Sequence, residues 1–166
     1  MSDSTADSAP VIPADPLVTG GRIVVGVDDS PDAGIALRWA LREAIVRQAS
    51  LEVVHAWQAP MSALPFGGTF VVSVDEAEID QAAREQLDKL VDTAIAELDV
   101  PAPAVTRTAV PGAAVLTLLD ISADADLLVV GSHGRTGLRR LLLGSVASAV
   151  VQHAACPVVV IRLPED

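Results

Sequence analysis

The stretch LLVVGSHGRTGLRRLLLGSVASAVV, residues 127–151, joins two apolar segments through a loop rich in glycine and arginine. Its start, LLVVG, predicts a short buried strand, and its end, SVASAVV, predicts the beginning of an apolar helix. Residues 131–146 hold four glycines and three arginines, and the longer run 127–164 has no Asp or Glu. A strand, a loop and a helix in this order form one unit of an α/β fold.

The same alternation runs through the rest of the chain. Apolar runs predict strands at 22–28, 50–57, 104–110, 126–131 and 156–163, and helical spacing predicts helices at 31–48, 73–98, 113–123 and 145–155. Five strands that alternate with four helices predict an open parallel sheet with helices on both faces, because each right-handed crossover lays a helix on the sheet. Periodicity alone leaves the order of the strands open.

Local signals indicate where some of these elements begin. Ser30 is expected to cap the first helix, with Pro31 in its first turn, where no amide hydrogen is needed. Ser73 and Glu76 have the spacing of a capping box for the next helix. Residues 58–72 hold two prolines and two glycines, and they are expected to form a loop that either closes over a cleft or is disordered.

Composition limits the class of protein. With 166 residues, of which 51% are hydrophobic, we expect a single domain over 21–164 after a disordered polar tail, residues 1–20. The net charge of −11 argues against nucleic acids and anionic membranes as partners. No segment has the roughly 18 apolar residues of a membrane span, and we find no secretory signal. The single cysteine, Cys156, fits a reducing cytoplasm, and we expect it to act as a small buried apolar residue.

The glycine-rich loop lies where parallel sheets bind ligands, beyond the carboxyl end of a strand. The helix that begins near Ser145 has free amide groups and a partial positive charge at its start, and glycines allow an anion to approach the backbone. Arg135, Arg139 and Arg140 add positive charge. A polyphosphate fits this environment. The alternative is that the glycines serve tight packing and that the arginines are solvated.

Two common phosphate-binding signatures do not fit. A Walker loop ends in Gly-Lys-Ser/Thr, whereas LGS at 143–145 has no lysine. A dinucleotide fingerprint would follow the first strand, where Asp28, Asp29 and Asp32 would repel a pyrophosphate.

Gly131, Gly134 and the pair Gly144-Ser145 follow the spacing G-2x-G-9x-G-(S/T), and on these residues the chain resembles the ATP-binding universal stress proteins. IVVGVDDSPDA is similar to the first strand and turn of that family, and HAACPVVVIR is similar to its last strand. The resemblance therefore runs over nearly the whole chain beyond the tail. It implies a sheet ordered 3-2-1-4-5 in a three-layer, HUP-like sandwich.

The resemblance also implies which residues bind ATP together with Mg²⁺. Gly26 would line the adenine side, Ala56 would offer backbone hydrogen bonds to the base, and Asp28 would bind the ribose or a metal near the phosphates. Val130 and Gly131 would lie against the ribose. The residues that would wrap the phosphates are Gly134, Gly144, Ser145 and Val146.

Several of these residues also have a plainer interpretation. Asp28 could simply form the turn before the first helix, and Asp29 could equally take that role. We prefer a functional Asp28, because carboxylates at strand ends commonly bind ribose hydroxyls. Ser145 could be only an N-cap, or it could cap the helix and bind phosphate at once. His133 is expected to be an exposed loop residue, His55 and His153 to be structural, and the three histidines lack metal-ligand spacing.

No nucleophile and base pair is evident in the sequence. The resemblance therefore implies a nucleotide-dependent regulator of the stress response rather than a dedicated enzyme. The alternatives are a cyclic-AMP-binding protein, a slow ATPase or phosphotransferase, and an interaction protein with an empty cleft. In the family's strand order the apolar run 157–163 is an edge strand, which predicts a homodimer through this edge.

Overall fold

The computed structural model describes residues 20–58, 61–63, 69–71, 75–133 and 143–162. Its elements, in chain order, are β1 (Arg22–Gly26), α1 (Pro31–Arg47), β2 (Ser50–Trp57), β3 (Met61–Ala63), β4 (Thr69–Val71), α2 (Glu76–Ala96), β5 (Val105–Pro111), α3 (Ala114–Ile121), β6 (Leu127–Gly131), α4 (Ser145–His153) and β7 (Val158–Ile161). The strands and helices predicted from the sequence are all present, with borders shifted by a few residues.

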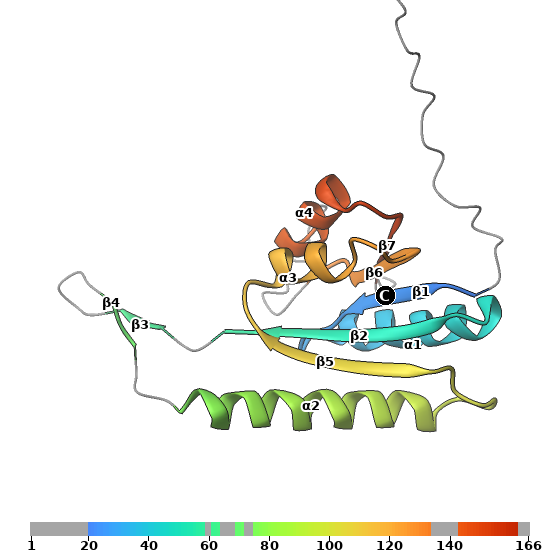
Figure 1. Ribbon diagram of the computed structural model, residues 1–166. Helices are drawn as coiled ribbons and strands as arrows, with labels where there is room; N and C mark the ends of the chain where they lie inside the picture. Colours follow the sequence, from blue (N-terminus) through green and yellow to red (C-terminus); the bar gives the residue numbers. More distant parts are fainter. Residues whose placement is uncertain (1–19, 59–60, 64–68, 72–74, 134–142, 163–166) are drawn as a thin grey trace, which may run out of the picture.

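β1 lies at the centre of a parallel five-stranded sheet whose order is β5-β2-β1-β6-β7 (Figure 1). On one side Gly26 of β1 pairs with Val54 of β2, and on the other Val25 pairs with Val129 of β6. Counted along the chain without the short strands β3 and β4, this is the order 3-2-1-4-5, so the prediction is confirmed. The carboxyl ends of β1 and β6 therefore lie side by side.

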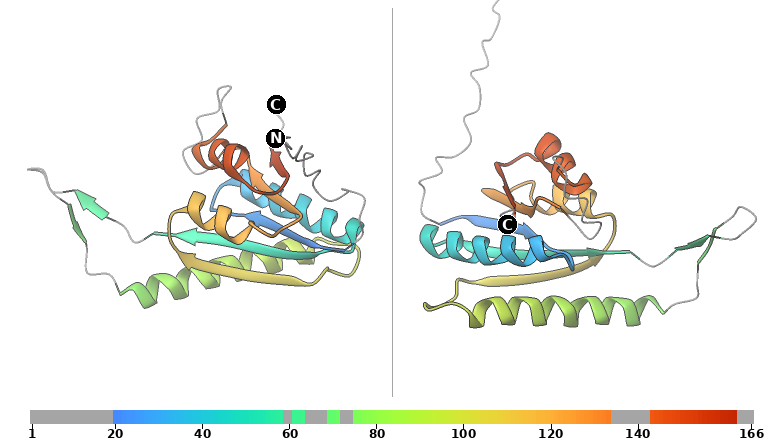
Figure 2. Two further views of the ribbon diagram at one scale, coloured as in Figure 1. Left: turned by 45° about the horizontal axis from the view of Figure 1, so that its top comes forward. Right: turned by 180° about the vertical axis from the view of Figure 1, so that it is seen from behind.

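Helices cover both faces of this sheet, as predicted (Figure 2). Ile23 and Val25 of β1 belong to a core that also contains α1 and α2, whereas Val24 belongs to the core under α3 and α4. The strands are apolar on both sides because both sides are covered. α1 turns a face of small residues to the sheet, with Ala36 and Ala40 fully buried, and small side chains allow close approach of helix and strands.

The caps of the first two helices differ in how well the sequence predicted them. Ser30 caps α1, and its Oγ accepts a hydrogen bond from the N–H of Ala33 at 3.2 Å, as predicted. α2 begins at Glu76, and its N-cap is Asp75, which accepts from the N–H of Ala77 at 3.0 Å. The capping box at Ser73 is therefore wrong, because a carboxylate two residues later supplies the cap.

The predicted loop at 58–72 contains a hairpin. β3 and β4 pair in antiparallel fashion through Met61 with Val71 and Ala63 with Thr69, so the prediction of a loop is wrong for these residues. The hairpin lies beyond the end of β2 and forms a sheet of its own (Figure 1). Thr69-Phe70-Val71, a run of strand-forming residues, was the available signal. The rest of the predicted loop lies outside the described residues.

The predicted N-terminal tail and the limits of the domain are not tested by the structure. Apart from Gly20, the predicted tail lies outside the described residues, so the tail and the domain limits 21–164 stay predictions. Among the helices that the structure describes, none combines the length and the apolar character needed to cross a membrane.

Candidate functional site

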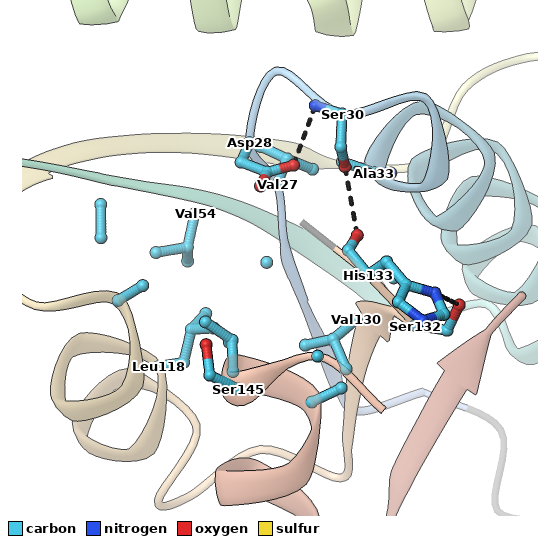
Figure 3. Close-up of a pocket in the computed structure, with 17 residues that line it drawn as sticks. Val27, Asp28, Ser30, Ala33, Val54, Leu118, Val130, Ser132, His133 and Ser145 are labelled. Carbon is cyan, nitrogen blue, oxygen red and sulfur yellow. Dashed lines mark hydrogen bonds between the residues drawn. The ribbon is translucent and has the colours of Figure 1, made fainter. Parts of the chain in front are cut away.

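A cavity of about 290 Å³ opens at the carboxyl ends of β1 and β6 (Figure 3). It lies between the turn after β1, the end of β6, the first turn of α4 and the start of α3. Eight of the nine predicted site residues line it, namely Gly26, Asp28, Ala56, Val130, Gly131, Gly144, Ser145 and Val146. The ninth, Gly134, lies outside the described residues. The fold thus gathers the predicted residues that it describes around one space.

The first turn of α4 borders the cavity through Ser145, Val146 and Ala147. The N-cap is Gly144, which has no side chain to accept hydrogen bonds from these residues. The first helical bond runs from the N–H of Ser148 to Gly144 O at 2.9 Å, so the three N–H groups before Ser148 have no partner within the helix. The first turn also contains no acidic residue. Such a helix start attracts an anion.

Ser145 is the first residue of α4 rather than its N-cap, because Gly144 holds that position. The alternative that Ser145 serves only as a cap is therefore wrong. Its side chain is exposed, and Figure 3 shows its hydroxyl turned toward the cavity. The hydroxyl is placed to add a donor beside the free amides of the helix.

The end of β2 presents backbone groups to the same cavity. Val54 O accepts a hydrogen bond from the N–H of Val27 at 2.9 Å, and the pairing of β2 with β1 ends with Gly26 opposite Val54. Because the backbone groups of a strand point alternately to its two neighbours, those of Ala56 point to the same side as those of Val54. Ala56 lies past the last paired residue of β1, so its N–H and C=O face the cavity that it lines.

Asp28 both forms the turn and lines the cavity. Its Oδ1 accepts a hydrogen bond from the N–H of Ser30 at 2.9 Å, as in an Asx turn. Asp28 therefore does form the turn before α1, and it also lines the cavity. Asp29 instead accepts a hydrogen bond from Gln86 of α2 and does not line this cavity. Of the two neighbouring carboxylates, only Asp28 is placed to meet a ligand in this cavity.

The sequence did not reveal a buried clamp between α1 and the end of β6. Asp32, only 7% exposed, accepts hydrogen bonds from Ser132 Oγ at 2.9 Å and from the N–H of His133 at 3.2 Å. Its carboxylate lies in the first turn of α1, where a negative charge is stabilised by the helix dipole. The position of Asp32 near the start of a helix could be recognised from the sequence. Its hydrogen-bond partner Ser132 could not, because it lies one hundred residues further along the chain. Asp32 is thus part of the frame of the cavity and does not line it.

Asp32, Ser132 and His133 contain the three groups of a hydrolytic triad, but their arrangement excludes that chemistry. Ser132 Oγ donates to Asp32 and lies 2.9 Å from His133 Nδ1, so the serine stands between the acid and the base. Ser132 is also fully buried, although it belongs with His133 to the lining of the cavity. The prediction that His133 is exposed is wrong, because the clamp holds its side chain at 20% exposure.

Both strands that meet at the cavity end in glycine, for reasons of space. A Cβ on Gly131 would lie 3.0 Å from Asp32 Cβ and 3.2 Å from the backbone carbon of Asp32, so a side chain there would push α1 away from the end of β6. A Cβ on Gly26 would lie 2.8 Å from a methyl group of Leu118. The glycines therefore serve tight packing as well as lining the cavity.

The charge of the described cavity wall is unusual for an anion site. Asp28 lines it, and no Lys or Arg among the described residues does so. The three arginines of the glycine-rich loop, Arg135, Arg139 and Arg140, lie outside the described residues. The described part of the chain also contains no group of three or more His, Cys, Asp or Glu that could hold a metal ion. Asp28 alone fits a metal that arrives already bound to a ligand's phosphates, and does not make a resident metal site.

Cys156 lies on the opposite side of the sheet from α1, packed against the core under α3 and α4. Burial raises the pKa of its thiol, which keeps the thiol protonated and poorly nucleophilic. The side chain is half-buried rather than fully buried, and otherwise agrees with the small apolar residue that was expected.

Sequence comparisons relate the chain to one family. The sequence model of the Universal stress protein family matches residues 20–162. Universal stress protein Rv2623 of Mycobacterium tuberculosis (strain H37Rv) is 42% identical over 140 residues, which are 84% of this chain and 47% of that protein. The chain thus spans about half the length of the curated relatives it matches.

Solved structures share the fold. The universal stress protein from Archaeoglobus fulgidus in complex with dAMP is 29% identical, with a TM-score of 0.57 over 85% of this chain and 97% of that one. A universal stress protein in complex with cAMP is 26% identical, with a TM-score of 0.57 over 86% of this chain and 96% of that one. Adenine nucleotides are therefore ligands of two proteins of this fold.

Proposed function

The chain belongs to the universal stress protein family, and from this premise we propose that it binds an adenine nucleotide in the cavity between β1 and β6. The observation that carries the proposal is the start of α4, where three amide groups without helical partners border the cavity and the first turn of the helix holds no acidic side chain. A phosphate group is the ligand such a helix start suits best.

The rest of the cavity supplies complementary positions for the base and the sugar. The adenine would lie toward Val54, Ala56 and Leu118, where apolar side chains flank the free backbone groups of Ala56. Asp28 would accept hydrogen bonds from the ribose, with Val130 and Gly131 against the sugar. A volume of about 290 Å³ suits one mononucleotide better than a dinucleotide.

We propose ATP with Mg²⁺ as the ligand, on the spacing of Gly131, Gly134, Gly144 and Ser145. The glycines and Ser145 would wrap the phosphates, together with Val146, and Asp28 would contact the magnesium ion or the ribose. Bound magnesium would offset the charge of the phosphates beside Asp28. The complexes of relatives with dAMP and cAMP make a monophosphate the competing candidate.

The proposed role is regulation in the cytoplasm, in which nucleotide occupancy changes the conformation or the partners of the protein. The serine that lies beside His133, Ser132, is buried, which does not favour it as a nucleophile. Slow hydrolysis by water would be incidental to this role. A homodimer through 157–163 remains part of the proposal, because β7 lies at an edge of the sheet and its apolar side chains are only half-buried.

Calorimetric titration of the full chain with ATP and Mg²⁺, AMP and cAMP tests the proposal. We expect saturable binding of at least one of them, with the tightest binding for ATP and Mg²⁺. Gly144→Val should weaken binding at least about a hundredfold, because a branched side chain would occupy the space beside the free amides. Gly134→Val extends the test to the glycine outside the described residues.

Gly34→Val is the matched control, because a Cβ there meets only the end of the Arg38 side chain, at 3.8 Å. This variant should bind as the wild type does. If the wild-type protein binds none of the three nucleotides, the proposed function is refuted. Unchanged binding by Gly144→Val would refute the site.

A further inference from the structure

A second cavity, of about 330 Å³, lies on the other side of the turn after β1. α2 forms its outer wall, whereas the first cavity is bordered by α3 and α4. The two cavities share only the turn residues Val27, Asp28 and Ser30. The proposed nucleotide site leaves this second space unused.

The walls of the second cavity are largely apolar. Val27 and Leu87 are nearly buried at 7% and 3% exposure, and Leu90 is partly buried beside them. The ring of His55 is held in place, because its Nδ1 donates to Val27 O at 3.0 Å. At the turn, Gln86 of α2 donates a hydrogen bond to Asp29, and both residues border the cavity. Fixed apolar walls of this kind suit a small ligand with an apolar body.

Lys89 brings the only positive charge to the described lining of this cavity, and it is the only lysine in the whole sequence. α2 carries many acidic residues, and Glu85, one turn before Lys89, accepts a hydrogen bond from Gln81 at 2.7 Å. Asp88 and Asp92 bind the guanidinium of Arg107 at 2.9 and 2.5 Å. Among the described residues, no ion pair engages the ammonium group of Lys89 itself, which leaves it available to a ligand.

The carboxylates of Asp28 and Asp29 also border this space, and they determine how an anionic ligand must lie. Both already accept hydrogen bonds, from the N–H of Ser30 and from Gln86. Lys89 follows Gln86 by three residues, or about 4.5 Å along the helix axis, so the positive charge is displaced from the acidic turn. An anionic group would therefore face Lys89, with the apolar body against Leu87 and Leu90.

We propose that the second cavity is a binding site for a small amphipathic carboxylate, with an apolar chain or ring and one negative charge. Val27, Leu87 and Leu90 pack against the apolar part, and Lys89 binds the carboxylate. The site does not depend on nucleotide binding, because Lys89 and both leucines lie outside the first cavity.

Titration of the full, ¹⁵N-labelled chain with sodium octanoate below its micelle concentration tests this site. We expect saturable amide shifts centred on Leu87, Lys89 and His55, rather than on the start of α4. Lys89→Gln should weaken octanoate binding about fivefold, the contribution of one partly exposed ion pair, and Lys89→Arg should restore most of the affinity. Octanol, of equal chain length but neutral, should bind wild-type protein more weakly than octanoate does.

Two further variants separate the cavity from a general effect of charge. Thr93→Trp places a large side chain over the cavity from an exposed position of α2 and should weaken octanoate binding more than about tenfold. Arg84→Gln removes a positive charge from the same helix outside the cavity and should leave the affinity unchanged. Thermal unfolding of each variant checks that the fold is retained.

The proposal is overturned if octanoate does not bind saturably, or if the shifts centre on the first cavity. Equal octanoate affinity in the wild type, Lys89→Gln and Thr93→Trp would overturn it as well. The Lys89 variants decide the matter alone if Thr93→Trp does not fold. Titration with AMP or ATP is a separate measurement, so failure of the proposed nucleotide site and failure of this one are distinguishable.

Discussion

α1 and α4 both begin at the carboxyl edge of the sheet, within a few residues of the same cavity, but their first turns are opposite in character. α1 is capped by Ser30, begins with Pro31, which has no N–H, and carries the buried carboxylate of Asp32. α4 is capped by Gly144, has no side-chain cap and has no acid in its first turn. The first helix start thus has a side-chain cap and an acid of its own, whereas the second has neither.

This difference shows how one fold can hold a rigid frame and a binding site side by side. The start of α1 is capped by Ser30, and its carboxylate Asp32 accepts hydrogen bonds from Ser132 and His133, so it fixes the end of β6. The start of α4 has donors without acceptors, which a ligand can supply.

The largest effect is expected when α4 is made to resemble α1. Gly144→Asp introduces a carboxylate at the N-cap, where backbone angles of −60° and 163° suit any residue. It should weaken binding of AMP or ATP at least about a hundredfold, because like charges close together cost several kcal/mol. Calorimetric titration measures this loss.

Gly144→Asn is the control for this change, because it has the same shape and capping ability without the charge. It should weaken nucleotide binding much less than Gly144→Asp does. Equal losses in the two variants would mean that space, and not charge, decides binding at the start of α4.

Removal of the clamp should have the largest effect on stability. Asp32→Ala leaves the N–H of His133 without an acceptor and leaves the Ser132 hydroxyl with His133 Nδ1 as its one remaining partner, and we expect a loss of about 2–3 kcal/mol in the free energy of unfolding. Urea denaturation measures it. Asp120→Ala, at an exposed position of α3, is the control and should change stability by less than about 0.5 kcal/mol. A small effect of Asp32→Ala would show that the start of α1 does not act as a frame.

Close approach of β6 to α1 should make Gly131 intolerant of a side chain. Gly131→Ala would place a Cβ 3.2 Å from the Asp32 backbone carbon, and we expect it to cost about 1–2 kcal/mol of stability. Gly26→Ala is the comparison, because its Cβ would meet the side chain of Leu118, which can move. Thermal or urea unfolding should therefore show a smaller loss for Gly26→Ala, and the reverse order would contradict this account.

The smallest effect concerns the two serines at the helix starts. Ser30→Ala removes the acceptor for the N–H of Ala33 and should cost about 1 kcal/mol of stability. Ser145→Ala should change stability by less than about 0.5 kcal/mol, since Ser145 caps nothing, and it should weaken nucleotide binding severalfold. Unfolding and nucleotide binding are measured for both variants. Equal losses of stability in Ser30→Ala and Ser145→Ala would contradict the difference between the two helix starts.

The sequence by itself determined the class of fold and most of the first cavity. Apolar runs that alternate with helical spacing are local patterns, and they placed the strands and helices correctly to within a few residues. The glycine and serine spacing after β6 is also local, and through the family resemblance it identified eight residues that line the cavity. Ser30 was recognisable as a cap because its partner lies three residues away.

Only the tertiary structure decided which distant residues meet. The bond between Asp32 and Ser132 spans one hundred residues, and that between Asp29 and Gln86 spans fifty-seven, so no periodicity or short motif encodes either one. The clamp and the second cavity exist because parallel crossovers bring the turn after β1 against both β6 and α2. Local spacing fixes what each segment can form, whereas long-range packing fixes which polar groups remain free for a ligand.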